Sequence, residues 1–439
     1  MREHAFKGKH LERWTPTTYR NSFILKTLKR LLDIGIGVYS IILLMVITTG
    51  GFEITLLGVS IKAHHLYTPI KLLIPLIALR LLITMKIKNL LLLSVSIITS
   101  LIVVEMVIRL WNPPIAGQEM VQVHRASPLF GWDLVPEAFG IGFMGESYHI
   151  NSWGFRDTEH EIEKQPGTNR IMVIGDSFTY GARVNLEDTY PKQLEKALNH
   201  LSIKCEIINC GVIGHNMWQH YEVLKRKVLQ FHPDLVILGL FENDLAASVS
   251  PHENSDEYQG ANPFKNQNRF GILEHSSLWN FLTNANTIYE YKYRYRQGYS
   301  YMKTIGERKK ELGPGNPASI HYRIMSGKAE KKKYLDFSDA LKKFVTLANA
   351  EGAKVLVAMI PDSVQLNEPH LQAVNRFVQQ ACKNYGVSFL DLTPILESEE
   401  DHASLYLFPF DAHNSPKGLR LIGKALADQI IKLKLLSSS

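Results

Sequence analysis

The feature that most constrains this chain is a regular alternation of short apolar runs and amphipathic stretches after residue 170. Ile171–Ile174 is an apolar run closed by Gly175, which predicts a short strand buried on both faces. Four more strands are predicted at Cys205–Asn209, Asp234–Leu240, Lys354–Ile360 and Val387–Leu392. Helices are predicted at Glu187–His200, Met217–Phe231, Phe337–Glu351, Leu371–Tyr385 and Pro416–Leu435. This alternation predicts an α/β fold, a three-layer α/β/α sandwich around a five-stranded parallel sheet.

An all-α transmembrane region is predicted ahead of the sandwich. Leu31–Gly50 and Leu90–Leu110 are apolar runs long enough to cross a bilayer. Tyr67–Met85 is also apolar, but two prolines and two basic residues interrupt it, so it is the weakest of about three spans. The alternative for each run is a buried globular helix, and this alternative has the most weight for Tyr67–Met85.

The distribution of basic residues predicts the orientation of these spans. The formal net charge is +7, and eight of the Lys and Arg residues lie within the first thirty positions. The turn after the middle span carries Lys86 and Lys88. The positive-inside rule therefore places the N-terminus and this turn in the cytoplasm, and everything after Trp111 on the other side. If the middle span does not cross, the rest of the chain falls in the cytoplasm. The basic excess is explained by topology, so no nucleic-acid partner is expected.

We expect residues 1–114 to form a cytoplasmic basic arm and the membrane region, and residues 115–439 to form the catalytic domain. Residues 115–167 are rich in aromatic residues and glycine, including Asn151–Arg156, and predict irregular structure or a hairpin. Residues 246–333 are predicted to be an insertion, with alternating tyrosines and basic residues from Tyr289. Such a segment could stack on sugars or bases, lie at a membrane surface, or be a solvated helix. The three cysteines form no disulfide framework, and we expect free core thiols, with Cys205–Cys210 as the only conceivable bridge.

Polar residues and glycines follow the predicted strands. Ser177 follows the first strand, and Gly214 closes Asn209-Cys-Gly-Val-Ile-Gly after the second. Asn243 follows the third strand, and Asp411 and His413 follow the fifth across a loop. The carboxyl ends of parallel strands meet at one edge of the sheet, where such folds bind ligands. A hydroxyl, a histidine with a nearby carboxylate, and amide donors are what acyl transfer requires.

These blocks resemble the SGNH (GDSL-type) hydrolase superfamily, whose motifs carry Ser, Gly, Asn and His in this order. The resemblance implies sheet order 2-1-3-4-5, with Ser177 as nucleophile, His413 as base and Asp411 orienting His413. It also implies that the N–H groups of Ser177 and Gly214 and the Asn243 amide form the oxyanion hole. Many members of the superfamily have a glycine where this chain has Glu242, and many esterases have Asp-x-x-His where it has Asp-x-His. The first departure leaves the shape of the oxyanion pocket open. The second leaves the substrate open more than the mechanism.

The sequence therefore predicts a serine esterase at the cell membrane, with its catalytic domain outside the cytoplasm. The expected substrates are O-acyl groups, above all acetyl, on glycans at the cell surface. An O-acyltransferase with the same triad, a lipid esterase or thioesterase, and a non-catalytic glycan-binding or assembly protein are the alternatives. No cofactor is expected, and no cluster of His, Cys and carboxylate residues has the spacing of a metal site.

Overall fold

The computed structural model describes most of the chain, in two compact units, Met1–Trp111 and Asn112–Ser439. The tyrosine-rich segment from Tyr289 lies outside the described residues. The described ranges are 16–49, 52–56, 59–63, 67–111, 123–142, 145–245, 276–278, 281–282, 318–408 and 411–436.

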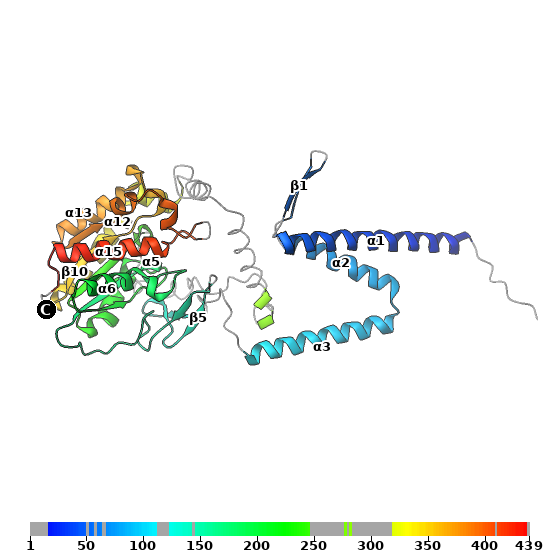
Figure 1. Cartoon of the computed structure of the whole chain (residues 1–439), viewed down its shortest axis with the longest axis horizontal. Coiled ribbons are helices and arrows are strands. Elements are labelled where there is room, and N and C mark those ends of the chain that lie inside the picture. The colour runs from blue at the N-terminus through cyan, green and yellow to red at the C-terminus, as the bar shows by residue number, and fades with distance from the viewer. Residues whose placement is uncertain are drawn as a thin grey trace, which may run out of the picture. The chain divides into compact units, whose positions relative to one another are not determined.

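The first unit contains three helices and a hairpin (Figure 1). The helices are α1 (Pro16–Thr49), α2 (Tyr67–Thr84) and α3 (Ile87–Trp111). The antiparallel hairpin of β1 (Phe52–Leu56) and β2 (Val59–Ala63), which the sequence analysis did not anticipate, joins α1 to α2.

Two of these helices are long and apolar enough to cross a membrane. They are Phe23–Ile47 within α1, with a mean hydropathy of 2.1, and Ile87–Leu110 within α3, with a mean hydropathy of 2.5. α2 has 18 residues and contains Pro75, and it is not one of the two. The prediction of three helices agrees with the fold, and two of them have the composition of a membrane span.

The second unit is built around a five-stranded parallel sheet. Its order is β11-β10-β9-β7-β8, which in chain order is 2-1-3-4-5. Every neighbouring pair is parallel, and this confirms the predicted fold class. The strands are β7 (Asn169–Gly175), β8 (Cys205–Asn209), β9 (Leu235–Leu240), β10 (Lys354–Met359) and β11 (Ser388–Asp391).

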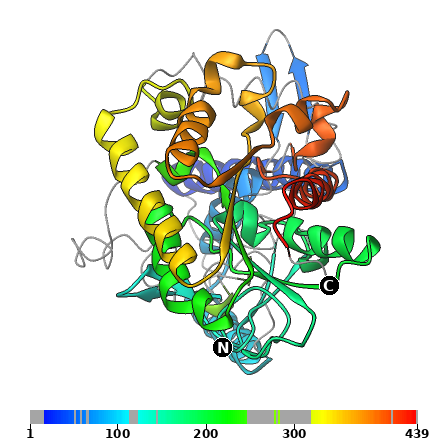
Figure 2. The ribbon, with the colours of Figure 1, turned by 90° about the vertical axis from the view of Figure 1, so that its left-hand side faces the viewer.

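Helices cover both faces of the sheet, because alternate side chains of each strand are apolar on either side. On β7, Ile171 and Val173 face one core, and Met172 and Ile174 face the other. The first core is covered by α6 (Tyr190–His200) and α15 (Pro416–Lys432), which lie side by side in Figures 1 and 2. The second core is covered by α7 (Met217–Val223), α12 (Lys331–Ala350) and α13 (Ala373–Asn384).

Helix ends differ from the predictions at several places. The helix predicted at Met217–Phe231 is α-helical only to Val223 and then continues as a π-helical and a 3-10 turn. α12 begins at Lys331, ahead of the predicted Phe337. A further helix, α11 (Ile320–Met325), contributes buried side chains to the core, although its residues fall within the range predicted as an insertion. Two short helices, α5 (Ser177–Tyr180) and α14 (Thr393–Glu397), were not predicted.

The segment ahead of the sheet forms two small hairpins. β3 (His124–Ser127) pairs with β4 (Gly131–Leu134), and β5 (Phe139–Ile141) pairs with β6 (Ser147–His149). Trp132, Leu134 and Tyr148 from these strands pack with Tyr180 and Val212 in a third apolar cluster. The three cysteines are free and buried, as expected.

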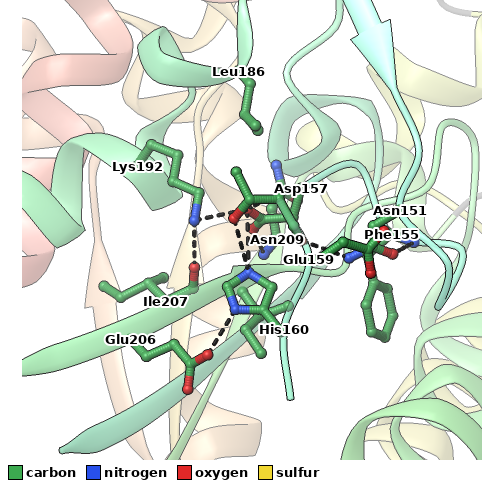
Figure 3. Close-up of polar contacts among 12 residues, drawn as sticks. Asn151, Phe155, Asp157, Glu159, His160, Leu186, Lys192, Glu206, Ile207 and Asn209 are labelled. Atoms are coloured by element: carbon green, nitrogen blue, oxygen red, sulfur yellow. Dashed lines mark hydrogen bonds and ion pairs between the residues drawn. The ribbon is translucent and has the colours of Figure 1, made fainter. Parts of the chain in front are cut away.

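Asp157 is the centre of a buried polar network that ties this segment to the sheet (Figure 3). Its carboxylate accepts hydrogen bonds from the Asn209 backbone N–H at 2.7 Å and from Lys192 Nζ at 2.8 Å. His160 bridges Asp157 and Glu206. Burial alone would lower the pKa of His160, but the hydrogen bonds to these two carboxylates outweigh it and raise the pKa to about 9. His160 is therefore protonated at neutral pH, and its charge offsets those of its partners.

Candidate active site

Ser177 lies at the first position of α5, directly after β7 ends at Gly175. Asp176 caps this short helix, since its Oδ1 accepts a hydrogen bond from the Phe178 N–H at 2.9 Å. Ser177 is 7% exposed. The turn aims a hydroxyl out of the carboxyl edge of the sheet, at the point where the strand order reverses between β7 and β9.

Three of the predicted side chains form a continuous hydrogen-bonded chain. His413 Nε2 lies 2.7 Å from Ser177 Oγ, and His413 Nδ1 lies 2.5 Å from Asp411 Oδ1. Because an ionised carboxylate only accepts, Nδ1 carries the proton and Nε2 accepts from the serine hydroxyl. This is the tautomer in which a histidine can take a proton from a nucleophile.

The Asp-x-His spacing is compatible with this arrangement. Asp411 Oδ1 accepts from the His413 backbone N–H at 3.0 Å as well as from the ring, so one oxygen holds both groups across the two-residue separation. The loop is held on both sides, since Leu407 N–H donates to the His413 carbonyl and Ser415 caps α15. The centres of the Phe178 ring and the His413 imidazole lie 4.7 Å apart, so the two rings are in contact.

The electrostatics of the pair favour a charged carboxylate. Burial would raise the pKa of Asp411, but the charge and hydrogen bonds of His413 outweigh it and hold this pKa well below its ordinary value. Burial would likewise lower the pKa of His413, and the Asp411 carboxylate outweighs it, so this pKa is raised above 6.5. The pair can therefore stabilise an imidazolium formed during a reaction.

Gly214 and Asn243 follow the strands on either side of Ser177. The Gly214 backbone has φ of +73°, a conformation that favours glycine, and a Cβ there would lie 3.3 Å from the Trp132 ring, which would have to shift slightly to admit it. Its N–H makes no hydrogen bond within the part of the chain that the structure describes. The Asn243 carboxamide oxygen is buried without a partner among the described residues, so no internal bond prevents the amide from turning towards a ligand.

Two further carboxyl groups, those of Asp176 and Asp244, are buried close to Ser177 and Asn243 in the chain. Burial, followed by the nearby Asp244, raises the pKa of Asp176 to about 7. Asp244 accepts from the Phe241 N–H at 2.8 Å and pairs with the buried His220 at 3.0 Å. The Asp176 cap braces the turn that carries Ser177, and the contacts of Asp244 brace the turn that carries Asn243.

Glu242 is buried and pairs with His321 of α11, with Oε1 2.7 Å from Nδ1. The residue that departs from the family pattern thus ties the turn of Asn243 to a helix that returns from the predicted insertion. No local pattern predicts this contact, because the two residues are 79 positions apart along the chain. Among the described residues, no group of His, Cys, Asp and Glu side chains could hold a metal ion.

Comparison with known proteins agrees with the fold. The GDSL-like lipase/acylhydrolase family model matches residues 173–421, more than half of the chain. The chain therefore belongs to this family of ester hydrolases. No curated protein matches it significantly.

Solved structures with a similar fold include TesA, with a TM-score of 0.37 and 14% identity over 61% of this chain and 100% of that one. A lipase/acylhydrolase from Enterococcus faecalis has a TM-score of 0.36 and 14% identity, covering 62% of this chain and 99% of that one. Axe2, an acetylxylan esterase from Geobacillus stearothermophilus, has a TM-score of 0.35 and 11% identity, covering 62% of this chain and 97% of that one.

Proposed function

We propose that this chain is a membrane-anchored serine esterase that removes small O-acyl groups, such as acetyl, from glycans outside the cytoplasm. The observation that carries the proposal is the hydrogen-bonded chain from Asp411 through His413 to Ser177. In this reading Ser177 is the nucleophile, His413 the general base and acid, and Asp411 the group that orients the imidazole.

The reaction would proceed through an acyl-enzyme. Ser177 Oγ attacks the ester carbonyl carbon while its proton moves to His413 Nε2, and the carbonyl oxygen becomes an oxyanion. The N–H groups of Ser177 and Gly214 and the Asn243 amide would hold that oxyanion; the first N–H groups of a helix, such as that of Ser177, have no intrahelical partner. Collapse expels the sugar alcohol, which takes the proton from His413. Water, deprotonated by His413, then attacks the acyl-serine and releases the acid.

The openness of the site supports a small acyl group on a bulky molecule. The side chains of His413 and Asp411 are 23% and 22% exposed, and Gly214 is exposed. An ester projecting from a polymer can reach such an edge without the polymer entering the protein.

A contact between α1 and α2 supports three membrane crossings. Arg80 binds Asp33 in bidentate fashion, at 2.7 Å and 3.2 Å, and Gly35 lets Leu76 pack close to α1. A charged side chain in a membrane is costly unless it is paired, and here the partner lies on the neighbouring helix. The pair would let α2 cross despite its basic residue, and three crossings place the catalytic unit opposite the N-terminus.

Thiol labelling of intact cells should test this topology. The native cysteines are buried, so single cysteines at the exposed positions Asn89 and Glu351 can be labelled selectively with a membrane-impermeant maleimide. We expect Glu351→Cys to be labelled in intact cells, and Asn89→Cys only after the cells are permeabilised. The reverse pattern is the result for two crossings and a cytoplasmic catalytic unit, and it would contradict the proposal.

The acyl preference should be measured with p-nitrophenyl acetate, butyrate and octanoate and with the full chain in detergent. We expect kcat/KM to fall as the acyl chain lengthens. A rise with chain length would indicate a lipid esterase. If an oligosaccharide acceptor becomes acetylated while little free acetate appears, the enzyme is an O-acyltransferase, because the same acyl-serine then reacts with a sugar hydroxyl in place of water.

A further inference from the structure

The second oxygen of the Asp411 carboxylate has its own partner. Oδ1 is occupied by His413, and Oδ2 lies 3.3 Å from Nε of Arg183, a residue of the loop that follows the nucleophile helix α5. The Arg183 side chain is 20% exposed, so it is partly shielded from solvent beside the carboxylate. The Asp411 carboxylate is thus held between a histidine and an arginine.

The backbone of Arg183 is held in a conformation that arginine rarely adopts. Its φ is +66°, in the left-handed region that favours glycine. Such a conformation is strained for an arginine and persists where the surroundings enforce it. The Arg183 N–H donates to the Tyr148 hydroxyl at 2.8 Å, so a strand of the segment ahead of the sheet fixes this residue directly.

Arg156 fixes the chain on both sides of Arg183. This arginine is fully buried, and its guanidinium donates to the carbonyls of Gly181 at 2.5 Å and Val184 at 2.6 Å. It also donates to the Tyr180 carbonyl at 2.9 Å and lies 4.1 Å from the centre of the Tyr148 ring. A buried cation is costly unless its donors find acceptors. The two terminal nitrogens of Arg156 donate to backbone carbonyls, whereas its Nε has no partner among the described residues, so these carbonyls are what holds the guanidinium in place.

We propose that Arg183 is a positioning residue that sets the orientation of the catalytic Asp411, and that Arg156 and Tyr148 hold Arg183 in place for this task. The proposal rests on the function proposed above. It also gives a role to Arg156, the last residue of the segment Asn151–Arg156. With Oδ2 fixed, Oδ1 faces His413 and the imidazole keeps its Nε2 towards Ser177.

The charge of Arg183 should also affect the pH dependence of the reaction. The ionisable groups that act on His413 are Asp411 from its own loop, Asp176 ahead of α5 and Arg183 after it. Burial is the largest influence and lowers the pKa of His413, the two carboxylates raise it, and Arg183 lowers it. The reaction needs neutral His413, so removing the positive charge should raise this pKa and move the acid limb of the rate profile to higher pH.

The test is a comparison of Arg183→Gln and Arg183→Lys in the full chain, with kcat and KM for p-nitrophenyl acetate measured across the pH range. We expect the Gln variant to lose about 10- to 100-fold in kcat, as a misplaced catalytic group does, and to have an acid limb shifted upward. The Lys variant keeps the positive charge but lacks the planar guanidinium group. Its acid limb should therefore lie at the pH of the unaltered chain, whereas its kcat should be only partly recovered relative to the Gln variant. The control is Arg376→Gln on the exposed face of α13, which also removes one positive charge and should change neither kcat nor the acid limb.

The outcomes separate this role from others. An unchanged kcat and acid limb in Arg183→Gln would overturn the proposal, and so would a rise in KM alone, which would make Arg183 a substrate contact. Both variants should have a Tm close to that of the unaltered chain, because the Arg183 side chain is partly exposed. If the Gln and Lys variants lost Tm to the same extent and kcat to the same extent, the role of Arg183 would be purely structural, and this result would also overturn the proposal. If the unaltered chain hydrolyses no ester, the proposed function itself is contradicted, and the role of Arg183 with it.

Discussion

Replacing Ser177 with alanine should abolish ester hydrolysis by the full chain, with a loss in kcat on the order of 10⁴- to 10⁶-fold. In the proposed mechanism this hydroxyl forms the acyl-enzyme, and it lies 2.7 Å from His413 Nε2, the group proposed to take its proton. Residual activity would come from water bound in the same pocket. The measurement is the steady-state hydrolysis of p-nitrophenyl acetate by the purified variant in detergent.

The loss must be specific to this hydroxyl. Ser338→Ala removes a hydroxyl that bonds to Tyr385 on the helices covering one face of the sheet, and it should leave kcat unchanged. Both variants should keep the Tm of the unaltered chain to within a few degrees. If Ser177→Ala retained about a tenth or more of the activity, another group would be the nucleophile.

Gly211→Ala should disturb both folding and catalysis. A Cβ at this position would lie 2.2 Å from the backbone N of Tyr180 and 2.7 Å from the carbonyl carbon of Thr179, both in the nucleophile helix α5. Neither backbone atom can move without shifting α5. Overpacking of this kind typically costs about 1–3 kcal/mol, and a displaced nucleophile lowers kcat by about 100-fold. Thermal unfolding and ester hydrolysis measure the two effects.

Gly352→Ala is the matched control for this substitution. Its backbone has φ of +82°, and a Cβ there meets nothing within 4 Å. It should lose about 1–2 kcal/mol of stability through backbone strain and keep the full kcat. A Gly211→Ala variant with unchanged kcat would mean that α5 is not held against this loop as the structure describes.

Much of the fold of the second unit can be predicted from the sequence, because both faces of a parallel sheet are buried and its strands are short apolar runs. β8 has the predicted limits Cys205–Asn209, and β9 and β10 differ from their predictions by one residue. Ser177 could be selected because it follows the end of such a strand, and Asp411 and His413 because their block, with that of Ser177, resembles the motifs of the SGNH superfamily. The hydrogen bonds that join them agree with that selection, and their catalytic roles stay predictions.

The contacts that support the site could not be predicted, since they join residues that no local pattern connects. Arg183 meets Asp411 across 228 positions, and Arg156 meets carbonyls 24 to 28 positions away. The hairpins β3–β4 and β5–β6 have strands of three or four residues, too short for a clear alternation. The α11 helix was assigned to the insertion because its short apolar face is visible only against the core that it covers.

The central claim is tested most directly by locating the acyl group on the enzyme. The full chain is mixed with p-nitrophenyl acetate, quenched in acid within the first turnovers, digested and analysed by mass spectrometry. We predict one acetyl group, on the peptide that contains Ser177 and on that hydroxyl, which disappears on incubation at neutral pH and is absent from Ser177→Ala. An unmodified Ser177, or an acetyl group on another residue that turns over at the rate of hydrolysis, would contradict the account.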